Sequence, residues 1–478
     1  MSIGKEVSSS IRWMAGMRVI SQIFTWVATL IVIRLLSPED YGLMALAAVV
    51  IGLLDILDDM GLASALVKKK ELTDKFVRQI FGMLFIFNTG FYIALYVTAP
   101  FVADFFDDQR LSIIIQILGL QTLIRIFFYV PNAMMRRDMD FRSVSLIRFV
   151  AVVGQSLSIL VLAYLGFGVW SLVYGSLVYT AVQTLGAMIV SSYLRMPSLS
   201  FEGIGEALSF GGMITIHRIL YYIYNSADAV VMGKITGQKA LGFYSVAMQI
   251  ACLPMDKFMM ILNEVGFSAF STIQDNQQKM NELLRKAVRI LGIVVFPVFM
   301  GMSCTAPELV AVLLGEKWAE VALPLQIVSA VMALKMMNIT DPLLFAMGRP
   351  DVGVKALAIG CVIMPIAFYI GAVWGGLVGV SLSWLIAYPP YFYISMKIVL
   401  ATIGMKFSTY ISEFAYPALF SGIMYVMVML ARELISPMIG NTVIELVMLI
   451  FVGAVTYTGL VLAFQRDTVM QLYSMVRS

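Results

Sequence analysis

Charged side chains are scarce in this chain. Of its 478 residues, 13% are Asp, Glu, Lys or Arg, whereas 60% are hydrophobic. A soluble globular protein carries about 25% charged residues, because its surface has to be solvated. The composition therefore excludes a water-soluble globular protein of this length. No connection between apolar segments exceeds about 25 residues, which also leaves no room for a separate soluble domain.

Residues that bind metals or form disulfides are almost missing as well. The chain has one histidine, His217, and three cysteines, Cys252, Cys304 and Cys361, which lie in or near apolar segments. No cysteine or carboxylate stands at ligand spacing from the histidine, so we expect no metal site and no disulfide framework. A nucleotide-binding GxxxxGK[ST] motif is also missing, which argues against direct use of ATP. We expect no cofactor and no nucleic-acid partner.

Long apolar runs, by contrast, recur along the whole chain. Runs of about 18 or more residues are long enough to cross a hydrocarbon core of about 30 Å as helices. None shows the alternation of a transmembrane strand. The sequence therefore predicts an all-α polytopic membrane protein with about fourteen transmembrane helices. In chain order, the expected spans are 13–36, 42–66, 77–103, 111–133, 144–165, 168–192, 208–233, 240–264, 287–305, 321–346, 353–373, 375–396, 408–431 and 441–464.

The distribution of basic residues predicts the orientation of these spans. The first apolar run, about 24 residues long, is not followed by a small-residue cleavage site, so we interpret it as a retained span. If the N-terminus is cytoplasmic, roughly 22 of the 33 Lys and Arg residues lie in cytoplasmic loops and about 5 in outer loops. The positive-inside rule therefore predicts that both termini are cytoplasmic.

The two halves of the sequence resemble each other at an offset of about 200 residues. RLLSPEDYG at 34–42 matches KITGQKALG at 234–242, and the same offset sets Arg18 against Arg218. A repeat of six spans has the same orientation in both copies, which makes it a parallel repeat with two pseudo-symmetric six-helix lobes. The predicted parts are an N-terminal lobe at 1–192, a cytoplasmic linker at 193–207, a C-terminal lobe at 208–400, and two extra helices with a cytoplasmic tail at 401–478.

Each half opens with a span that carries an arginine-headed polar face. Residues three and four apart share one face of a helix. An ionisable residue near the bilayer centre costs on the order of 3 kcal/mol or more, so it normally faces a cavity or a partner. We therefore expect a cationic cavity between the lobes, with snorkelling of the arginines to the interface as the alternative. The two faces hold Arg18, Gln22, Thr25 and Thr29 in the first span and Arg218, Tyr221, Tyr222, Asn225 and Asp228 in the seventh.

Three more cations stand within spans. Arg125 in the fourth span and Lys335 in the tenth are corresponding members of the repeat, and Lys257 lies in the eighth. We expect each of them either to line the same cavity, to snorkel to an interface, or to pair with local acids. Arginine suits a phosphate ligand, because its planar fork makes bidentate, charge-assisted hydrogen bonds and stays protonated.

The acids within spans leave two interpretations open. Asp228 is a candidate for coupling transport to a proton or sodium gradient, because burial can bring a carboxyl group towards protonation at neutral pH. A plain salt bridge to a cavity cation is the alternative. Asp58, Asp59 and Glu264 stand near cytoplasmic helix ends, where a polar cluster at the interface is the alternative to ion coupling. His217 is interpreted as a satisfied polar residue beside Arg218.

Four segments in order give the chain a resemblance to a known family. It resembles the colanic-acid-type Wzx flippases, which are polysaccharide exporters of the superfamily that also holds multidrug and lipid II exporters. The similarity runs from about residue 10 to about residue 400 and does not cover the last two spans. The segments are RLLSPEDYGLMALA (34–47), DDMGLASALVKKKEL (58–72), FSAFSTIQDNQQKM (267–280) and LLGEKWAEVALPLQIV (313–328).

The resemblance implies a two-lobed, V-shaped, fourteen-helix transporter in a bacterial cytoplasmic membrane. It would be a monomer and no enzyme. It would move an undecaprenyl-pyrophosphate-linked oligosaccharide repeat unit from the inner to the outer leaflet by alternating access. The implied partners are this lipid-linked oligosaccharide, membrane lipids, and the polysaccharide polymerase and chain-length machinery. Arg18 and Arg218 stand where the resemblance implies a cationic cavity lining.

Three rival functions remain open at this point. An ion-coupled multidrug antiporter on the same fold should have an acid-dominated site, whereas arginines are prominent among the charges here. A membrane oligosaccharide polymerase or ligase is expected to carry catalytic residues on a substantial outer loop, and the outer loops here are short. A non-transporting scaffold would not need matched polar faces in both halves.

Overall fold

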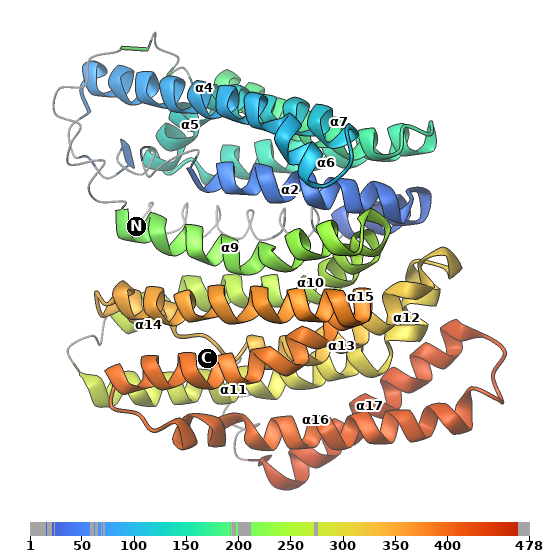
Figure 1. Cartoon of the computed structure of the whole chain (residues 1–478). Coiled ribbons are helices and arrows are strands. Elements are labelled where there is room, and N and C mark those ends of the chain that lie inside the picture. Colours follow the sequence, from blue (N-terminus) through green and yellow to red (C-terminus); the bar gives the residue numbers. More distant parts are fainter. Residues whose placement is uncertain are drawn as a thin grey trace. The chain divides into compact units, whose positions relative to one another are not determined.

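The described part of the chain is helical throughout. The computed structural model describes residues 16, 22, 24–57, 62, 66–67, 69, 72–191, 193, 197–198, 212–271 and 276–466, and only the backbone of 212–216 and 256–271. Within these residues no strand is found, and Figure 1 shows long helices in succession from blue to red. The predicted all-α fold is thereby confirmed.

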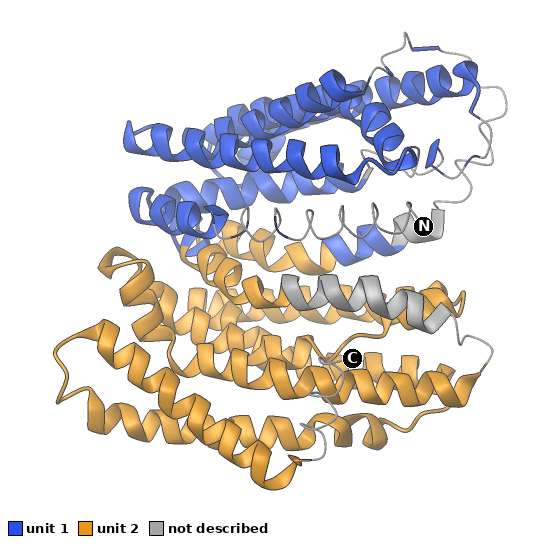
Figure 2. Cartoon of the chain, turned by 180° about the vertical axis from the view of Figure 1, so that it is seen from behind, with its two compact units in different colours: residues 1–222, 237–242 blue, residues 223–236, 243–478 orange. Residues whose placement is uncertain are grey.

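The chain divides into two compact units, which Figure 2 colours separately. Unit 1 comprises residues 1–222 and 237–242, and unit 2 comprises residues 223–236 and 243–478. Helix α9 (Gly212–Ile235) and helix α10 (Gln238–Ser271) contribute residues to both units. Most of the predicted linker at 193–207 lies outside the described residues.

Among the described residues, unit 1 has five long helices besides its share of α9 and α10. Helix α4 packs on α5, α5 also packs on α7, and α7 packs on α6. Ile80, Leu84 and Val130 belong to the apolar core between α4 and α5. This burial of apolar side chains holds the helices together where they face each other. The five helices are α2 (Pro38–Leu57), α4 (Asp74–Phe105), α5 (Arg110–Arg137), α6 (Phe141–Tyr164) and α7 (Val169–Val190).

Polar side chains set the start of two helices of unit 1. The Thr73 hydroxyl accepts a hydrogen bond from the Phe76 N–H at 3.2 Å, just before α4. The Asp140 carboxylate accepts one from the Ser143 N–H at 3.1 Å, just before α6. Each cap satisfies an N–H that has no partner within its helix. The short α5–α6 turn, residues 138–140, is thereby defined by local sequence.

Unit 2 is built around α11, which packs on both α13 and α16, and α16 packs on α17. The longest helix, α15, has 53 residues and is interrupted at Gly376, whose φ of 53° suits glycine. This kink separates the spans predicted at 353–373 and 375–396. The elements are α11 (Gln277–Cys304), α12 (Ala306–Leu313), η1 (Glu316–Val321), α13 (Ala322–Lys335), α14 (Asp341–Ala346), α15 (Pro350–Thr402), α16 (Phe407–Ile435) and α17 (Thr442–Phe464).

The predicted tenth span, 321–346, is wrong at its C-terminal end. The helical stretch Glu316–Lys335 has 20 residues and stops at Lys335, after which α14 begins at Asp341. Pro342 lies in the first turn of α14, where its missing N–H costs no helical hydrogen bond. Hydropathy continues across the break, which is why the sequence pattern alone did not reveal it. Lys335 therefore lies at the end of a helix.

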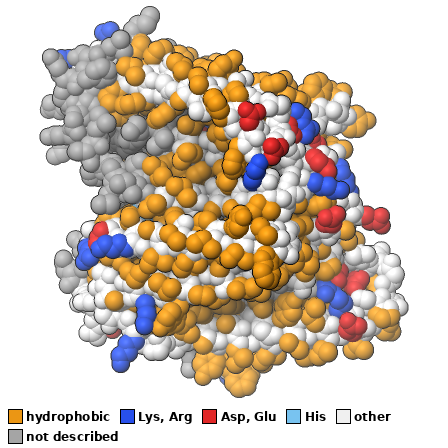
Figure 3. All heavy atoms as spheres, viewed as in Figure 1, with side chains coloured by type: hydrophobic (Ala, Val, Ile, Leu, Met, Phe, Trp, Pro, Cys, Tyr) orange, Lys and Arg blue, Asp and Glu red, His pale blue; other side chains and the backbone are white. Residues whose placement is uncertain are grey.

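The chain is a multi-pass membrane protein. Among the described residues, nine helices are long and apolar enough to cross a membrane, and the interrupted α15 is one of them. Exposed hydrophobic side chains lie along these helices, for example Val97 on α4, Val161 on α6 and Ile386 on α15. Hydrophobic side chains are spread widely over the described part of the face in Figure 3, and charged ones are few. Such a surface suits lipid and not water.

Candidate functional site

A polar network inside unit 2 connects α9, α10, α13 and α15. Lys335 Nζ donates to Asn225 Oδ1 at 3.0 Å. The Tyr244 hydroxyl donates to Asp228 Oδ2 at 2.6 Å, and Trp384 Nε1 donates to the Tyr244 oxygen at 2.7 Å. We call Asn225, Asp228, Tyr244, Lys335 and Trp384 the α9 network. It brings a cation, a carboxylate and two aromatic residues with polar atoms together within the helices of one unit.

Neutral donors satisfy the buried carboxylate of this network. Asp228 is 3% exposed, and Tyr244 and Trp384 are buried beside it. Its second oxygen, Oδ1, accepts from the backbone N–H of Ala229 at 2.7 Å. Burying an ionised carboxylate is costly unless hydrogen bonds replace its hydration. The tyrosine hydroxyl and the amide provide two of these bonds, and the indole in turn orients the tyrosine.

The cation of the network lies among aromatic rings. Lys335 Nζ is 4.5 Å from the centre of the Trp384 ring and 5.7 Å from that of Tyr224. Tyr224 is buried and also packs against Tyr391, with the two ring centres 5.5 Å apart. Aromatic faces attract a desolvated ammonium group, and the carbonyl end of α13 favours positive charge at the same place. The break after Lys335 thus places a cation at a helix C-terminus beside a cluster of tyrosine and tryptophan rings.

The structure divides the predicted polar face of α9. Arg218 and Tyr221 are exposed, and Tyr221 stacks on the buried His217 with ring centres 6.5 Å apart. The Tyr222 hydroxyl donates to the Val49 carbonyl oxygen at 2.7 Å, within unit 1. Asn225 and Asp228 instead join the α9 network of unit 2. The proposed substrate role of this face stays a prediction.

The structure describes some of the other predicted site residues and not the rest. Arg125 of α5 forms an ion pair with Asp55 of α2, so pairing with a local acid is the alternative that the structure displays. Gln22 and Thr25 are half-buried. Arg18, Asp58 and Asp59 lie outside the residues that the structure describes. For Lys257 and Glu264 it describes the backbone and not the side chains.

Several polar partners were not predicted. Glu413 of α16 is buried and accepts from Arg285 Nε at 2.6 Å and from Arg289 Nη2 at 2.5 Å, which fastens α16 to α11. The arginines stand four residues apart on α11, a spacing that places them on one helix face and was the available signal. Tyr244 and Trp384, the partners in the α9 network, are ordinary aromatic residues of apolar spans. No sequence pattern marks them.

No metal centre is indicated in the described part of the chain. Within it, no group of three or more His, Cys, Asp or Glu side chains is placed to hold a metal ion. Described carboxylates such as Asp228, Glu413 and Glu308 have hydrogen-bond donors from protein groups. The chemistry that the α9 network offers is hydrogen bonding, aromatic contact and charge.

A family model described as polysaccharide biosynthesis protein matches residues 31–323. Lipopolysaccharide biosynthesis protein WzxC of Escherichia coli (strain K12) is 26% identical over 394 residues, which cover 81% of this chain and 79% of WzxC. Succinoglycan biosynthesis transport protein ExoT of Rhizobium meliloti (strain 1021) is 24% identical over 480 residues, covering 99% of this chain and 96% of ExoT.

Solved structures share the fold at low sequence identity. The inward closed conformation of the lipid II flippase MurJ matches with a TM-score of 0.76 and 14% identity, covering 95% of this chain and 99% of MurJ. An inward-facing multidrug resistance transporter of the MATE family matches with a TM-score of 0.60 and 17% identity, covering 80% of this chain and 95% of its own.

Proposed function

Because the chain belongs to the family of polysaccharide biosynthesis proteins, we propose that it moves a lipid-linked oligosaccharide across a bacterial cytoplasmic membrane. Membership confirms the resemblance seen in the sequence. The observation that carries the proposal is the similarity to ExoT, a biosynthesis transport protein, over 99% of this chain. The fold that the chain shares with a lipid II flippase supports the same proposal. The proposed cargo is an undecaprenyl-pyrophosphate-linked repeat unit, transported from the inner to the outer leaflet.

The physical task is to bring a pyrophosphate and several sugars past hydrocarbon while the lipid tail stays in the bilayer. We propose that both termini are cytoplasmic and that no covalent chemistry is performed on the cargo. A parallel six-helix repeat suits alternating access, in which one half rocks against the other around a polar site. Binding of the head group at this site then lowers the free-energy cost of moving it through the bilayer. An ion gradient or removal of the product sets the direction of transport.

The proposed cargo contacts come from cations and aromatic residues. Arg18, Arg218 and Lys257 would hold the pyrophosphate by charge-assisted hydrogen bonds. The amphipathic rings of Tyr221 and Tyr222 suit sugar faces and hydroxyl groups. In the α9 network, Lys335 supplies a cation beside the buried rings of Tyr224 and Trp384, which supports a role of this region in recognising or sensing an anionic, sugar-bearing head group.

Asp228 is the proposed coupling carboxylate. Its two oxygens accept hydrogen bonds from the Tyr244 hydroxyl and the Ala229 amide, both of which are neutral. Protonation of the carboxylate therefore leaves no bonded cation without its counter-charge, whereas the protonated group can still bond to a hydroxyl. This arrangement supports proton coupling through rearrangement of the Tyr244–Trp384 pair. Sodium coupling is the other form of the same proposal.

The proposal is tested in a strain that lacks this gene. Arg218→Ala and Asp228→Asn are expressed at wild-type abundance, and surface polysaccharide and inward-facing lipid-linked repeat unit are measured. We expect about a tenfold loss of export for Arg218→Ala, with accumulation of the repeat unit in the inner leaflet. Arg466→Ala, an exposed arginine beyond α17, is the matched control and should export normally.

Two further outcomes decide between the parts of the proposal. Asp228→Asn should lose the dependence of export on the proton gradient, measured by adding an uncoupler to wild type and variant. Wild-type export by Arg218→Ala at normal abundance would exclude the cavity role of that residue. If deletion of the gene leaves surface polysaccharide unchanged and instead raises drug sensitivity, the chain is a multidrug exporter and the proposed cargo is wrong.

A further inference from the structure

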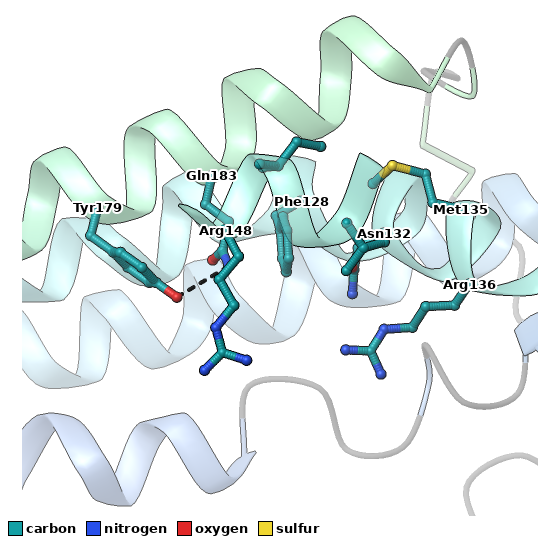
Figure 4. A pocket seen from close by; sticks show the side chains of 9 residues that line it. Phe128, Asn132, Met135, Arg136, Arg148, Tyr179 and Gln183 are labelled. Atoms are coloured by element: carbon teal, nitrogen blue, oxygen red, sulfur yellow. Dashed lines mark hydrogen bonds between the residues drawn. The ribbon is translucent and has the colours of Figure 1, made fainter. Parts of the chain in front are cut away.

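A cavity of about 240 Å³ lies inside unit 1, whereas the α9 network belongs to unit 2. It is bordered by the end of α5, the start of α6 and the second half of α7, which pack on one another. Figure 4 shows Arg136 and Arg148 with their guanidinium groups on the same side of this cavity. Its polar lining residues are Asn132, Arg136, Arg148, Tyr179 and Gln183.

The charge of the cavity has one sign. Arg136 and Arg148 are its charged residues, and none of the nine lining residues is Asp or Glu. Within the described part of the chain, neither arginine forms an ion pair, whereas the neighbouring Arg137 donates to the Leu66 and Lys69 carbonyl oxygens. Two guanidinium groups without a carboxylate between them repel each other, and an anion bound by both would relieve that repulsion. Their planar donor pairs match phosphate oxygens.

Uncharged polar groups on the cavity wall add further hydrogen-bonding capacity. Gln183 Nε2 donates to the Tyr179 oxygen at 3.3 Å, so the proton of the Tyr179 hydroxyl is not used in that bond. The Asn132 amide is half-buried on the α5 side. A hydroxyl and an amide can both donate to phosphate oxygens that the arginines leave unsatisfied. The cavity thus offers charged donors from the exposed Arg136 and Arg148 and neutral donors from its other polar lining residues.

The surroundings of the cavity are those of a lipid interface. Phe128 and Ile147 contribute apolar walls. On the adjoining surface of α6, Leu146 is 46% and Val150 is 50% exposed, as expected of side chains that face acyl chains. The arginines stand beside the turn between two spans, at the end of the unit that the basic loops predict to be cytoplasmic. Basic pockets between transmembrane helices at that level suit lipid head groups.

We propose that this cavity binds the phosphate group of a membrane lipid through Arg136 and Arg148. The head group would enter from the cytoplasmic leaflet, while the acyl or prenyl chain lies along the exposed apolar face of α6. The residues of this site belong to unit 1, whereas those of the α9 network belong to unit 2. Its occupant is either an anionic glycerophospholipid or a polyprenyl pyrophosphate, which share the phosphate chemistry.

Binding is measured on the purified full chain in detergent by native mass spectrometry. Three probes are titrated separately: phosphatidylglycerol, undecaprenyl pyrophosphate and inorganic phosphate. The test variant is Arg136→Gln/Arg148→Gln, and we expect its apparent Kd for the preferred lipid to rise about tenfold or more. Both side chains are exposed, so the folded state should persist, and the thermal midpoint in detergent verifies this.

Two control variants separate a specific site from general attraction. Arg142→Gln/Lys286→Gln removes the same number of charges from exposed positions outside the cavity and should bind lipid within about twofold of wild type. Asn132→Leu keeps the charge and removes one polar wall, and it should weaken lipid binding by about fivefold.

Each outcome is decisive. A loss of lipid affinity that is confined to the cavity variants supports the proposal. The lipid whose affinity falls more is then identified as the occupant. Equal loss in the Arg142→Gln/Lys286→Gln variant would show unspecific surface attraction and overturn it. Binding of inorganic phosphate as tight as that of both lipids would also overturn it, because the site would then hold a free anion. Transport is not part of the readout, so this result is independent of the proposed function.

Discussion

At the scale of single residues, two buried carboxylates of unit 2 are satisfied in opposite ways. Glu413 is bonded by two guanidinium groups, and its protonation would leave both without their shared counter-charge. Asp228 accepts hydrogen bonds from a hydroxyl and an amide, so its protonation leaves no hydrogen-bonded cation without a counter-charge. Glu413 is therefore suited to fastening helices, because breaking a buried pair is strongly destabilising. Asp228 is suited to a change of protonation during a cycle.

A third carboxylate lies outside the spans, in the turn between α4 and α5. Asp108 Oδ2 accepts from Arg110 Nη2 at 2.7 Å and from Gln238 Nε2 at 2.6 Å. The hydrogen bond from the Arg110 side chain, with help from Gln238, holds the pKa of Asp108 below its usual value. A depressed pKa means that ionised Asp108 stabilises the fold above its unfolded pKa of about 4. This contribution is lost as the pH falls through the depressed pKa.

Asp108→Asn should accordingly destabilise the protein in a pH-dependent way. At pH 7 we expect a loss of at most about 1 kcal/mol, because the pair is partly exposed to solvent. The difference from wild type should shrink as the pH is lowered below about 4. Thermal unfolding in detergent across this range measures it. Asp138→Asn, an exposed acid in the α5–α6 turn, serves as the control, and a pH-independent difference for Asp108→Asn would contradict the interpretation.

At the scale of elements, the starts of α2 and α10 touch through two glycines. A Cβ added to Gly42 would lie 1.9 Å from the Gln238 carbonyl oxygen, and one added to Gly242 would lie 1.7 Å from the Pro38 carbonyl oxygen. All four residues belong to unit 1. Residues 38 and 42 correspond to 238 and 242 in the sequence repeat, so each contact is the image of the other. The paired glycines that suggested a repeat thus mark a symmetric backbone contact.

Alanine at either glycine should therefore separate these helix ends. Gly42→Ala and Gly242→Ala each force backbone against backbone, and we expect a loss of about 1–3 kcal/mol together with reduced export. Thermal unfolding and surface polysaccharide are the measurements. Gly90→Ala on α4, where a Cβ meets nothing within 4 Å, is the control and should be neutral or stabilising. A Gly242→Ala protein as stable as wild type would show that the contact is not maintained.

At the scale of the whole molecule, orientation in the membrane is the prediction with the widest consequence. The basic loops predict that residue 279 is cytoplasmic, whereas residue 109 would lie outside. The test uses a chain in which Cys252, Cys304 and Cys361 are replaced by alanine and one new cysteine is introduced, as Gln109→Cys or Lys279→Cys. A membrane-impermeant maleimide should label the first in intact cells and the second only after permeabilisation. The opposite pattern would invert the assigned orientation.

The sequence by itself determined the class of the protein, because hydropathy over about 20 residues is a local property that the bilayer imposes on each span. It also indicated Asp228, Lys335 and Arg125 as costly residues that need partners. Only the tertiary structure decided those partners: Tyr244 for Asp228, Asn225 for Lys335 and Asp55 for Arg125. Such pairs join segments up to 110 residues apart. Helix packing sets them, and it leaves no periodic signal within either segment.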